Sequence, residues 1–168
     1  MKTPTARLAQ NLLLSVLLLF AAPAGAAEKL KVAFFGFEMF NTSPLPTSAE
    51  ERARIARIEE VFREMLSASG RYEVVAIPEE LQRKIAQSSK ITGCNGCQLD
   101  WAMEAGAEIA AFGVVQKVSN LILNENLYMD RVDGSAFFSR SVDIRGNTDE
   151  SWERGMRYLI GNYLLKEK

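Results

Sequence analysis

The sequence predicts a single α/β domain with a mixed sheet of about five strands, in the element order β-α-β-α-α-β-β-β-α. In the first two thirds of the chain, aromatic and β-branched runs alternate with amphipathic stretches of helical period, which is typical of parallel βαβ units. In the last third, strand-like runs follow one another without a helix, and Asp133-Gly134 gives a hairpin signal between the final two. No internal repeat or interdomain linker interrupts this pattern, so one domain is expected.

The first residues have the form of a secretory signal peptide. Lys2 and Arg7 precede an apolar run at 12–22, and small residues end in Ala24-Gly25-Ala26, an A-x-A cleavage site. The apolar run is about half the roughly 20 residues that a membrane-spanning helix needs. We therefore expect a signal peptide over 1–26, cleavage near Ala26, and a periplasmic domain over 27–168 with no membrane span.

The composition excludes several classes of function. The chain contains no histidine, which removes the commonest general base, the commonest zinc ligand and every Ser-His or Cys-His nucleophile. Its formal net charge is −1, and its acidic and basic residues are interspersed, so the sequence contains no cluster of basic residues that would bind nucleic acid. These features favour a domain that is not an enzyme, holds no metal or cofactor and binds no nucleic acid.

The first strand and helix have clear signals. Residues 30–40 predict a strand because they are aromatic and β-branched and precede a turn-prone loop. Thr47 or Ser48 is then placed to cap a helix, with Glu50 or Glu51 completing a capping box. Apolar residues recur in this helix at three- and four-residue steps, at Ile55, Ile58, Phe62, Met65 and Leu66. Its other side carries opposite charges four residues apart, namely Glu50 with Arg54 and Glu59 with Arg63.

The middle of the chain predicts shorter elements. Residues 71–77 indicate a short buried strand, and Pro78 is well placed to start a helix over 79–87. The next elements are a helix over 98–105 and an apolar central strand over 107–118. Gly36 and Gly113, each inside a predicted strand, indicate a bulge or a close approach of the backbone.

The late hairpin predicts two chemically different faces, because alternate side chains of a strand point to opposite sides of the sheet. A two-residue type I′ turn at Asp133-Gly134 sets the register. The mainly apolar face then pairs Leu123 with Ile144, Glu125 with Val142, Leu127 with Arg140 and Met129 with Phe138. The mainly polar face carries Asn124, Asn126 and Tyr128, with Phe137 opposite Asp130. A partly buried ion pair between Glu125 and Arg140 is expected, and a final amphipathic helix follows the cap residue Thr148.

The segment Cys94-Asn95-Gly96-Cys97 carries the reactive chemistry of the chain. Because export places it where disulfides persist, the leading interpretation is a structural disulfide that fixes the loop and the following helix start. The alternative is a thiol–disulfide redox pair, since a helix start stabilises a thiolate, although a thioredoxin-like site follows a strand directly. Gln98 stands where c-type haem attachment needs histidine, and two sulfurs do not make up the four ligands of a structural zinc site.

The polar face of the hairpin is the candidate partner face, represented by Asn124, Asn126, Tyr128 and Phe137. Its ordinary interpretation is the solvated side of an antiparallel sheet. The functional alternative is a contact surface, because exposed Tyr and Phe beside amides resemble the composition of interfaces. The carboxylates of the chain have ordinary explanations as turn or surface residues, so paired-carboxylate catalysis is not indicated; they are Glu38, Asp130, Asp133 and Asp143.

Several segments resemble the amino-terminal domain of TolB and the CsgG-like curli secretion and flagellar-assembly proteins. They are the strand 31–37, Tyr72-Glu73-Val74-Val75, Ala105-Gly106-Ala107, Phe112-Gly113-Val114-Val115 and the hairpin at Asp133-Gly134. The CxxC before a helix and the late meander are more closely similar to uncharacterised exported proteobacterial families, known as domains of unknown function. The resemblance implies this fold and a recognition role in envelope assemblies. The chain lacks a propeller, a lipidation cysteine and pore segments, so no transport activity carries over.

The predicted function is therefore a soluble periplasmic binding or assembly module that is not an enzyme and has an envelope or periplasmic protein as its partner. An accessory role in a periplasmic oxidation system is a narrower form of this hypothesis. Two alternatives stay open, a thiol–disulfide redox protein using Cys94 and Cys97, and a periplasmic binder of a small ligand.

Overall fold

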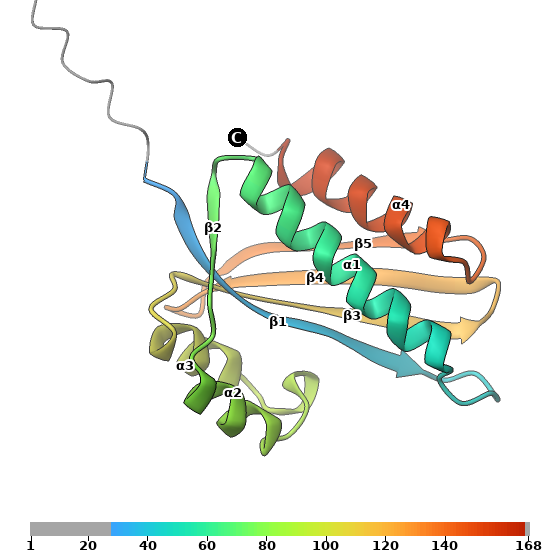
Figure 1. Cartoon of the computed structure of the whole chain (residues 1–168), viewed down its shortest axis with the longest axis horizontal. Helices are drawn as coiled ribbons and strands as arrows, with labels where there is room; N and C mark the ends of the chain where they lie inside the picture. Colours follow the sequence, from blue (N-terminus) through green and yellow to red (C-terminus); the bar gives the residue numbers. More distant parts are fainter. Residues whose placement is uncertain (1–27, 167–168) are drawn as a thin grey trace, which may run out of the picture.

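The computed structural model describes residues 28–166, which form one five-stranded sheet with helices on both faces (Figure 1). The strand order is β2-β1-β3-β4-β5; β1 is parallel to β2 and β3, and the remaining pairs are antiparallel. The elements are β1 (Leu30–Asn41), α1 (Ala49–Ala68), β2 (Tyr72–Val75), α2 (Glu79–Ala86), η1 (Ile91–Gly93), α3 (Cys97–Glu104), β3 (Ile109–Ser119), β4 (Ile122–Arg131), β5 (Ala136–Ile144), α4 (Asp149–Leu159) and the π-helical η2 (Ile160–Leu164). The predicted α/β class, element order and mixed sheet are confirmed. The predicted signal peptide lies outside the described residues, and no helix within 28–166 is long and apolar enough to cross a bilayer.

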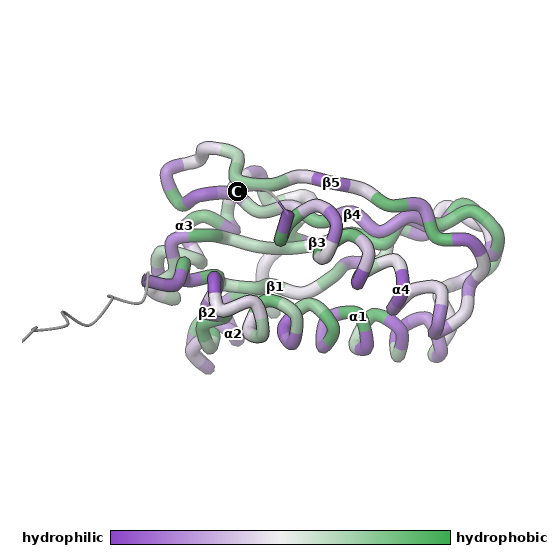
Figure 2. The backbone as a smooth tube through the Cα atoms, turned by 90° about the horizontal axis from the view of Figure 1, so that it is seen from above, coloured by the Kyte–Doolittle hydropathy of each residue, from purple (hydrophilic) through white to green (hydrophobic). Residues whose placement is uncertain are grey.

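The two faces of the sheet are covered unequally. Helices α1 and α4 lie side by side along one face, whereas α2 and α3 gather over the other face only at the end where β2 lies (Figure 1). The main core lies under α1 and α4, and includes Val32, Phe34, Ile58, Phe62, Leu66, Ile109, Leu127, Trp152 and Met156. In Figure 2 the apolar colour concentrates along the central strands β1 and β3, while the edge strand β5 alternates between polar and apolar residues. Part of the second face is therefore left without a helix.

The start of α1 shows the predicted capping box. The Ser48 side chain accepts a hydrogen bond from the Glu51 N–H at 3.2 Å, and the Glu51 carboxylate accepts one from the Ser48 N–H at 2.9 Å. The predicted apolar side of the helix packs on the sheet, and Glu59 pairs with Arg63 as expected. Arg54 differs, because it forms its ion pair with Asp149 of α4 at 2.8 Å rather than with Glu50. Asp149, the first residue of α4, therefore replaces Glu50 as the ion-pair partner of Arg54.

Strand β1 contains the bulge that Gly36 indicated. The register between β1 and β3 shifts between Phe34 and Phe37, and Gly36 has a φ of +86°, a conformation that glycine adopts without strain. The Phe37 N–H at the bulge donates to the Glu59 carboxylate at 2.9 Å. Gly113 permits a close approach, since a Cβ atom there would lie 2.0 Å from the Phe37 ring. Both glycine predictions are confirmed.

The β4–β5 hairpin reaches the predicted register by a different route. Arg131 donates its N–H to the Ser135 carbonyl at 2.8 Å, so the loop has three residues, and its left-handed residue is Gly134. Asp133 does not have a positive φ, so the predicted type I′ turn is wrong. A bulge at Phe137 then compensates for the odd loop length, and the four predicted pairs from Leu123–Ile144 to Met129–Phe138 are all present.

Candidate partner-binding face

The uncovered part of the sheet forms a surface that we call the open face. From Ala111 to Val118 of β3 and along β4, every second residue is buried on the side of α1 and α4, and the residues between are only half-buried or exposed. The open face consists of Phe40, Phe112, Val114, Gln116, Val118, Ile122, Asn124, Asn126, Tyr128, Ser139, Ser141 and Asp143. Three of the four residues predicted for the partner face, Asn124, Asn126 and Tyr128, therefore share it.

The centre of the open face is ordered by its own contacts. The Asn126 amide donates to the Asn124 side chain at 2.7 Å and to the Val114 carbonyl at 3.0 Å. The rings of Phe112 and Tyr128 stack with their centroids 5.2 Å apart. These side chains are held in place before any partner arrives, which lowers the entropy that binding costs.

Exposed apolar side chains gather at the end of the open face away from α2 and α3. Phe40 is 56% exposed, Val118 46% and Ile122 61%, and Leu121 in the adjoining turn is 78% exposed. Exposed apolar groups that lie together on a rigid sheet are typical of an interaction surface. The exposure of these residues does not follow from the sequence, because alternation predicts two faces of the sheet but not where the covering helices end.

Phe137 does not belong to the open face, so its predicted placement is wrong. As the extra residue of the β5 bulge, it turns to the side of the main core, where its ring packs edge-on against Tyr72 at 6.4 Å. The Arg131 guanidinium lies over the same ring at 4.9 Å. A period of two cannot anticipate this displacement, because a bulge shifts the alternation by one residue.

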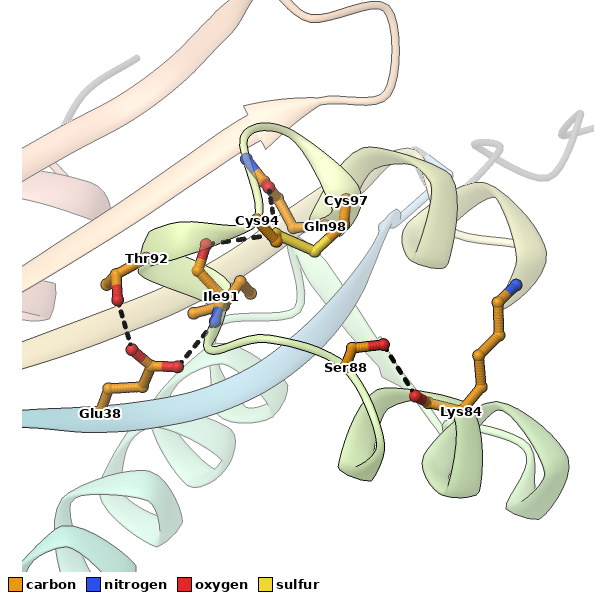
Figure 3. Close-up of a disulfide and its surroundings, with 8 residues drawn as sticks. All are labelled: Glu38, Lys84, Ser88, Ile91, Thr92, Cys94, Cys97 and Gln98. Atoms are coloured by element: carbon orange, nitrogen blue, oxygen red, sulfur yellow. Dashed lines mark hydrogen bonds between the residues drawn. A yellow bond between two sulfur atoms is a disulfide. The ribbon is translucent and has the colours of Figure 1, made fainter.

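The disulfide loop, residues 90–97, lies beside the open face at Phe40 and Val114. Figure 3 shows the disulfide and the contacts of this loop with Glu38. A disulfide joins Cys94 to Cys97, the first residue of α3, and the half-buried pair packs against Ile91 and Trp101. Glu38 of β1 accepts hydrogen bonds from the Ile91 N–H and from the Thr92 hydroxyl, each at 2.7 Å. A groove of about 480 Å³ lies between this loop and the strands, lined by Glu38, Met39, Phe40, Lys90, Thr92 and Val114.

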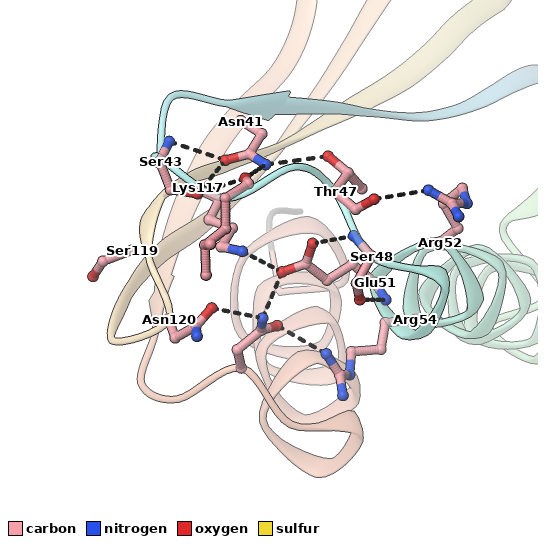
Figure 4. A network of polar contacts seen from close by, with 12 residues as sticks. Asn41, Ser43, Thr47, Ser48, Glu51, Arg52, Arg54, Lys117, Ser119 and Asn120 are labelled. Carbon is pink, nitrogen blue, oxygen red and sulfur yellow. Dashed lines mark hydrogen bonds and ion pairs between the residues drawn. The ribbon is translucent and has the colours of Figure 1, made fainter.

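A buried polar network supports the far end of the sheet (Figure 4). Lys117 is 3% exposed and its ammonium lies 2.5 Å from the carboxylate of Glu51, which is 1% exposed. Asn147, in the loop before α4, donates to the same carboxylate at 2.6 Å and contacts Asn120 at 3.2 Å. Burial raises the pKa of Glu51, but hydrogen bonds from Lys117, the Ser48 N–H and Asn147 outweigh it and lower the pKa below its ordinary value. The network ties together three loops beneath the exposed apolar residues.

Glu125 is a second buried carboxyl, and the predicted ion pair with Arg140 is absent. Glu125 is fully buried under α4, and neither carboxyl oxygen has a hydrogen-bond partner among the described residues. The Arg140 side chain instead lies over the Phe138 ring at 5.9 Å and donates to the Ser139 carbonyl. Burial raises the pKa of Glu125 well above its ordinary value, which favours the neutral acid.

The cysteines and two of the carboxylates considered from the sequence take part in local structural contacts. Residues 28–166 contain no group of three or more His, Cys, Asp or Glu side chains placed to hold a metal ion, and both cysteines are in the disulfide. The carboxylates considered from the sequence have separate structural roles: Glu38 holds the disulfide loop, and Asp133 accepts the Ser135 N–H within the hairpin turn.

Most of the chain matches one known protein family. Residues 30–164 match the family DUF3280, described as a protein of unknown function (DUF2380). The chain belongs to this family. The DUF3280 match confirms the prediction of an uncharacterised family, whereas the likeness to TolB and CsgG stays a prediction. A search of curated proteins found no match to the chain.

The DUF3280 chain also shares its fold with solved structures of low sequence identity. The LpoB C-terminal domain from Salmonella enterica has a TM-score of 0.52 at 13% identity, covering 73% of this chain and 87% of that chain. The PelC dodecamer from Paraburkholderia phytofirmans gives 0.51 at 15% identity, with 83% and 89% covered. The hypothetical protein CT253 from Chlamydia trachomatis gives 0.51 at 10% identity, with 80% and 95% covered. At these identities the likeness concerns the fold alone.

Proposed function

We propose that this protein is a non-enzymatic binding module of the bacterial envelope, and that its open face docks onto a protein partner. The observation that carries the proposal is the apolar group of Phe40, Val118 and Ile122, exposed beside a band of ordered amides. Protein interfaces combine such apolar centres with hydrogen-bonding groups at their margins. The predicted signal peptide supports export to the compartment where an envelope partner is found.

The disulfide has a structural role in this proposal. Its loop is held to β1 by Glu38, and together they form the groove wall beside Phe40. Fixing this loop keeps the margin of the open face in one shape for a partner. Cys97 begins α3, a position that a redox pair would also occupy. The half-buried disulfide packs against Ile91 and Trp101, however, and this packing supports the structural role over the redox alternative.

Site-specific photocrosslinking in the native periplasm tests the proposal. A photoreactive phenylalanine analogue placed at Val118 or Asn126 is expected to form an adduct with one envelope protein. The matched control is Met103 on α3, which is 52% exposed but lies outside the open face. Introducing Ile122→Asp should weaken the adduct about tenfold, because burying a charge in an apolar contact is costly. No adduct, or the same adduct from Met103, would overturn the proposal.

A further inference from the structure

The free edge of β5 is a second surface with the features of a binding site. Strand β5 has nine residues, Ala136–Ile144, and no strand of the described chain pairs with it on the side away from β4. An edge strand presents a row of unpaired backbone N–H and C=O groups, ready to pair with another extended chain. The strand is long enough for several such hydrogen bonds.

A groove of about 430 Å³ runs beside this edge, between β5 and α4. Gly155 lets the helix approach the strand closely, because a Cβ atom there would lie 2.4 Å from the Ile144 side chain. Tyr158 is 51% exposed in the groove wall, and its ring packs edge-on against Tyr163 at 5.7 Å. The groove therefore offers aromatic and apolar contacts to side chains of a strand that is added to β5.

The charged lining of the groove is cationic. It comprises Arg145, Arg154 and Asp143, and no carboxylate of the described chain pairs with the exposed Arg145. Arg154 contacts Glu150 at 3.3 Å, but both side chains are mostly exposed, so this ion pair contributes little and exchanges readily.

The other carboxylates of α4 do not offset these charges. Asp149 and Glu153 pair with Arg54 and Arg57 of α1, on the opposite side of the helix. An incoming carboxylate would therefore meet two guanidinium groups at the rim of the groove, in a chain whose overall charge is negative.

We propose that the β5 edge binds an extended segment of another protein by strand addition, and that an acidic side chain of this segment pairs with Arg145 and Arg154. Backbone hydrogen bonds to β5 would supply affinity, and the two arginines would select the acidic segment. The site adjoins the open face at Asp143, but it does not depend on the function proposed for that face.

Selection from a phage-displayed library of random linear dodecapeptides, against the chain 27–168, tests this inference. Enriched peptides are expected to contain Asp or Glu and to slow amide hydrogen exchange within β5. The double variant Arg145→Glu/Arg154→Glu should weaken the best peptide at least about tenfold, because attraction becomes repulsion. Arg83→Glu on α2, far from this edge, and Val118→Asp on the open face should leave its affinity unchanged.

Three outcomes would overturn the inference. The library yields no peptide, or its peptides lack carboxylates, or they protect amides elsewhere and not in β5. Circular dichroism of the double variant excludes a folding defect, which is not expected because both arginines are exposed.

Discussion

Two buried carboxyl groups of this protein, Glu51 and Glu125, differ in almost everything except burial. Glu51 is 1% exposed and Glu125 is fully buried. Glu51 accepts hydrogen bonds from Lys117, Asn147 and its own capping residue, whereas Glu125 faces apolar neighbours beneath α4 with no partner for either oxygen. The pKa of Glu51 is accordingly lowered and that of Glu125 is raised, because burial without donors favours the neutral acid.

The comparison shows that donors, and not depth alone, decide whether a buried carboxyl supports a fold. The carboxylate of Glu51 joins the ends of β3, α1 and the loop before α4 into one rigid end of the sheet. Glu125 makes no such connection, so the burial of its two oxygens without donors lowers the free energy of unfolding.

The largest expected effect is the loss of the partnered carboxylate. Glu51→Ala leaves Lys117 buried without a counter-ion, so we expect the free energy of unfolding to fall by about 3–5 kcal/mol. Urea unfolding followed by circular dichroism measures it. Glu60→Ala, an exposed site on the same helix, should change it by less than about 0.5 kcal/mol. Equal effects at the two sites would show that the network is not stabilising.

Replacement of the unpartnered carboxyl should have the opposite sign. Glu125→Leu removes two oxygens that lack donors while filling nearly the same volume, so we expect the free energy of unfolding to rise by about 1–2 kcal/mol. The same urea experiment at neutral pH measures this change. A clear loss of stability in Glu125→Leu would mean that Glu125 has a partner that its surroundings do not show.

The smallest effect is on the pH dependence of the free energy of unfolding. Glu51 changes it below the ordinary glutamate pKa, and Glu125 changes it above that value. A lowered pKa makes the contribution of Glu51 complete above the ordinary value of 4.5 and lost as the pH falls through its folded pKa. A raised pKa makes the contribution of Glu125 complete below 4.5 and lost as the pH rises toward its folded pKa. Glu125→Gln should therefore flatten a plot of the free energy of unfolding against pH only above pH 4.5. The slope that one group contributes does not exceed about 1.4 kcal/mol per pH unit. A flattening on the acid side would contradict the assignment.

The sequence predicted what depends on local pattern and period. Alternation in β4 placed Asn124, Asn126 and Tyr128 on one face, and the capping box predicted the start of α1 correctly. Phe137 was misplaced because a bulge changes the alternation. Burial of Glu51 and Lys117 was not predictable, because 66 residues separate these partners and only the folded sheet brings them together.

The bulge at Gly36 limits which insertions and deletions the sequence of β1 can accept. Before the bulge, Val32 and Phe34 face the core. After it, Phe37 and Met39 do, so the alternation of core-facing side chains is offset by one residue. Without that offset, Glu38 and Phe40 would point under α1 and the core phenylalanine would point to solvent. A one-residue insertion or deletion elsewhere in β1 would therefore reverse the alternation beyond that point. Side chains that now face the core would face the open face, and those of the open face would point into the core.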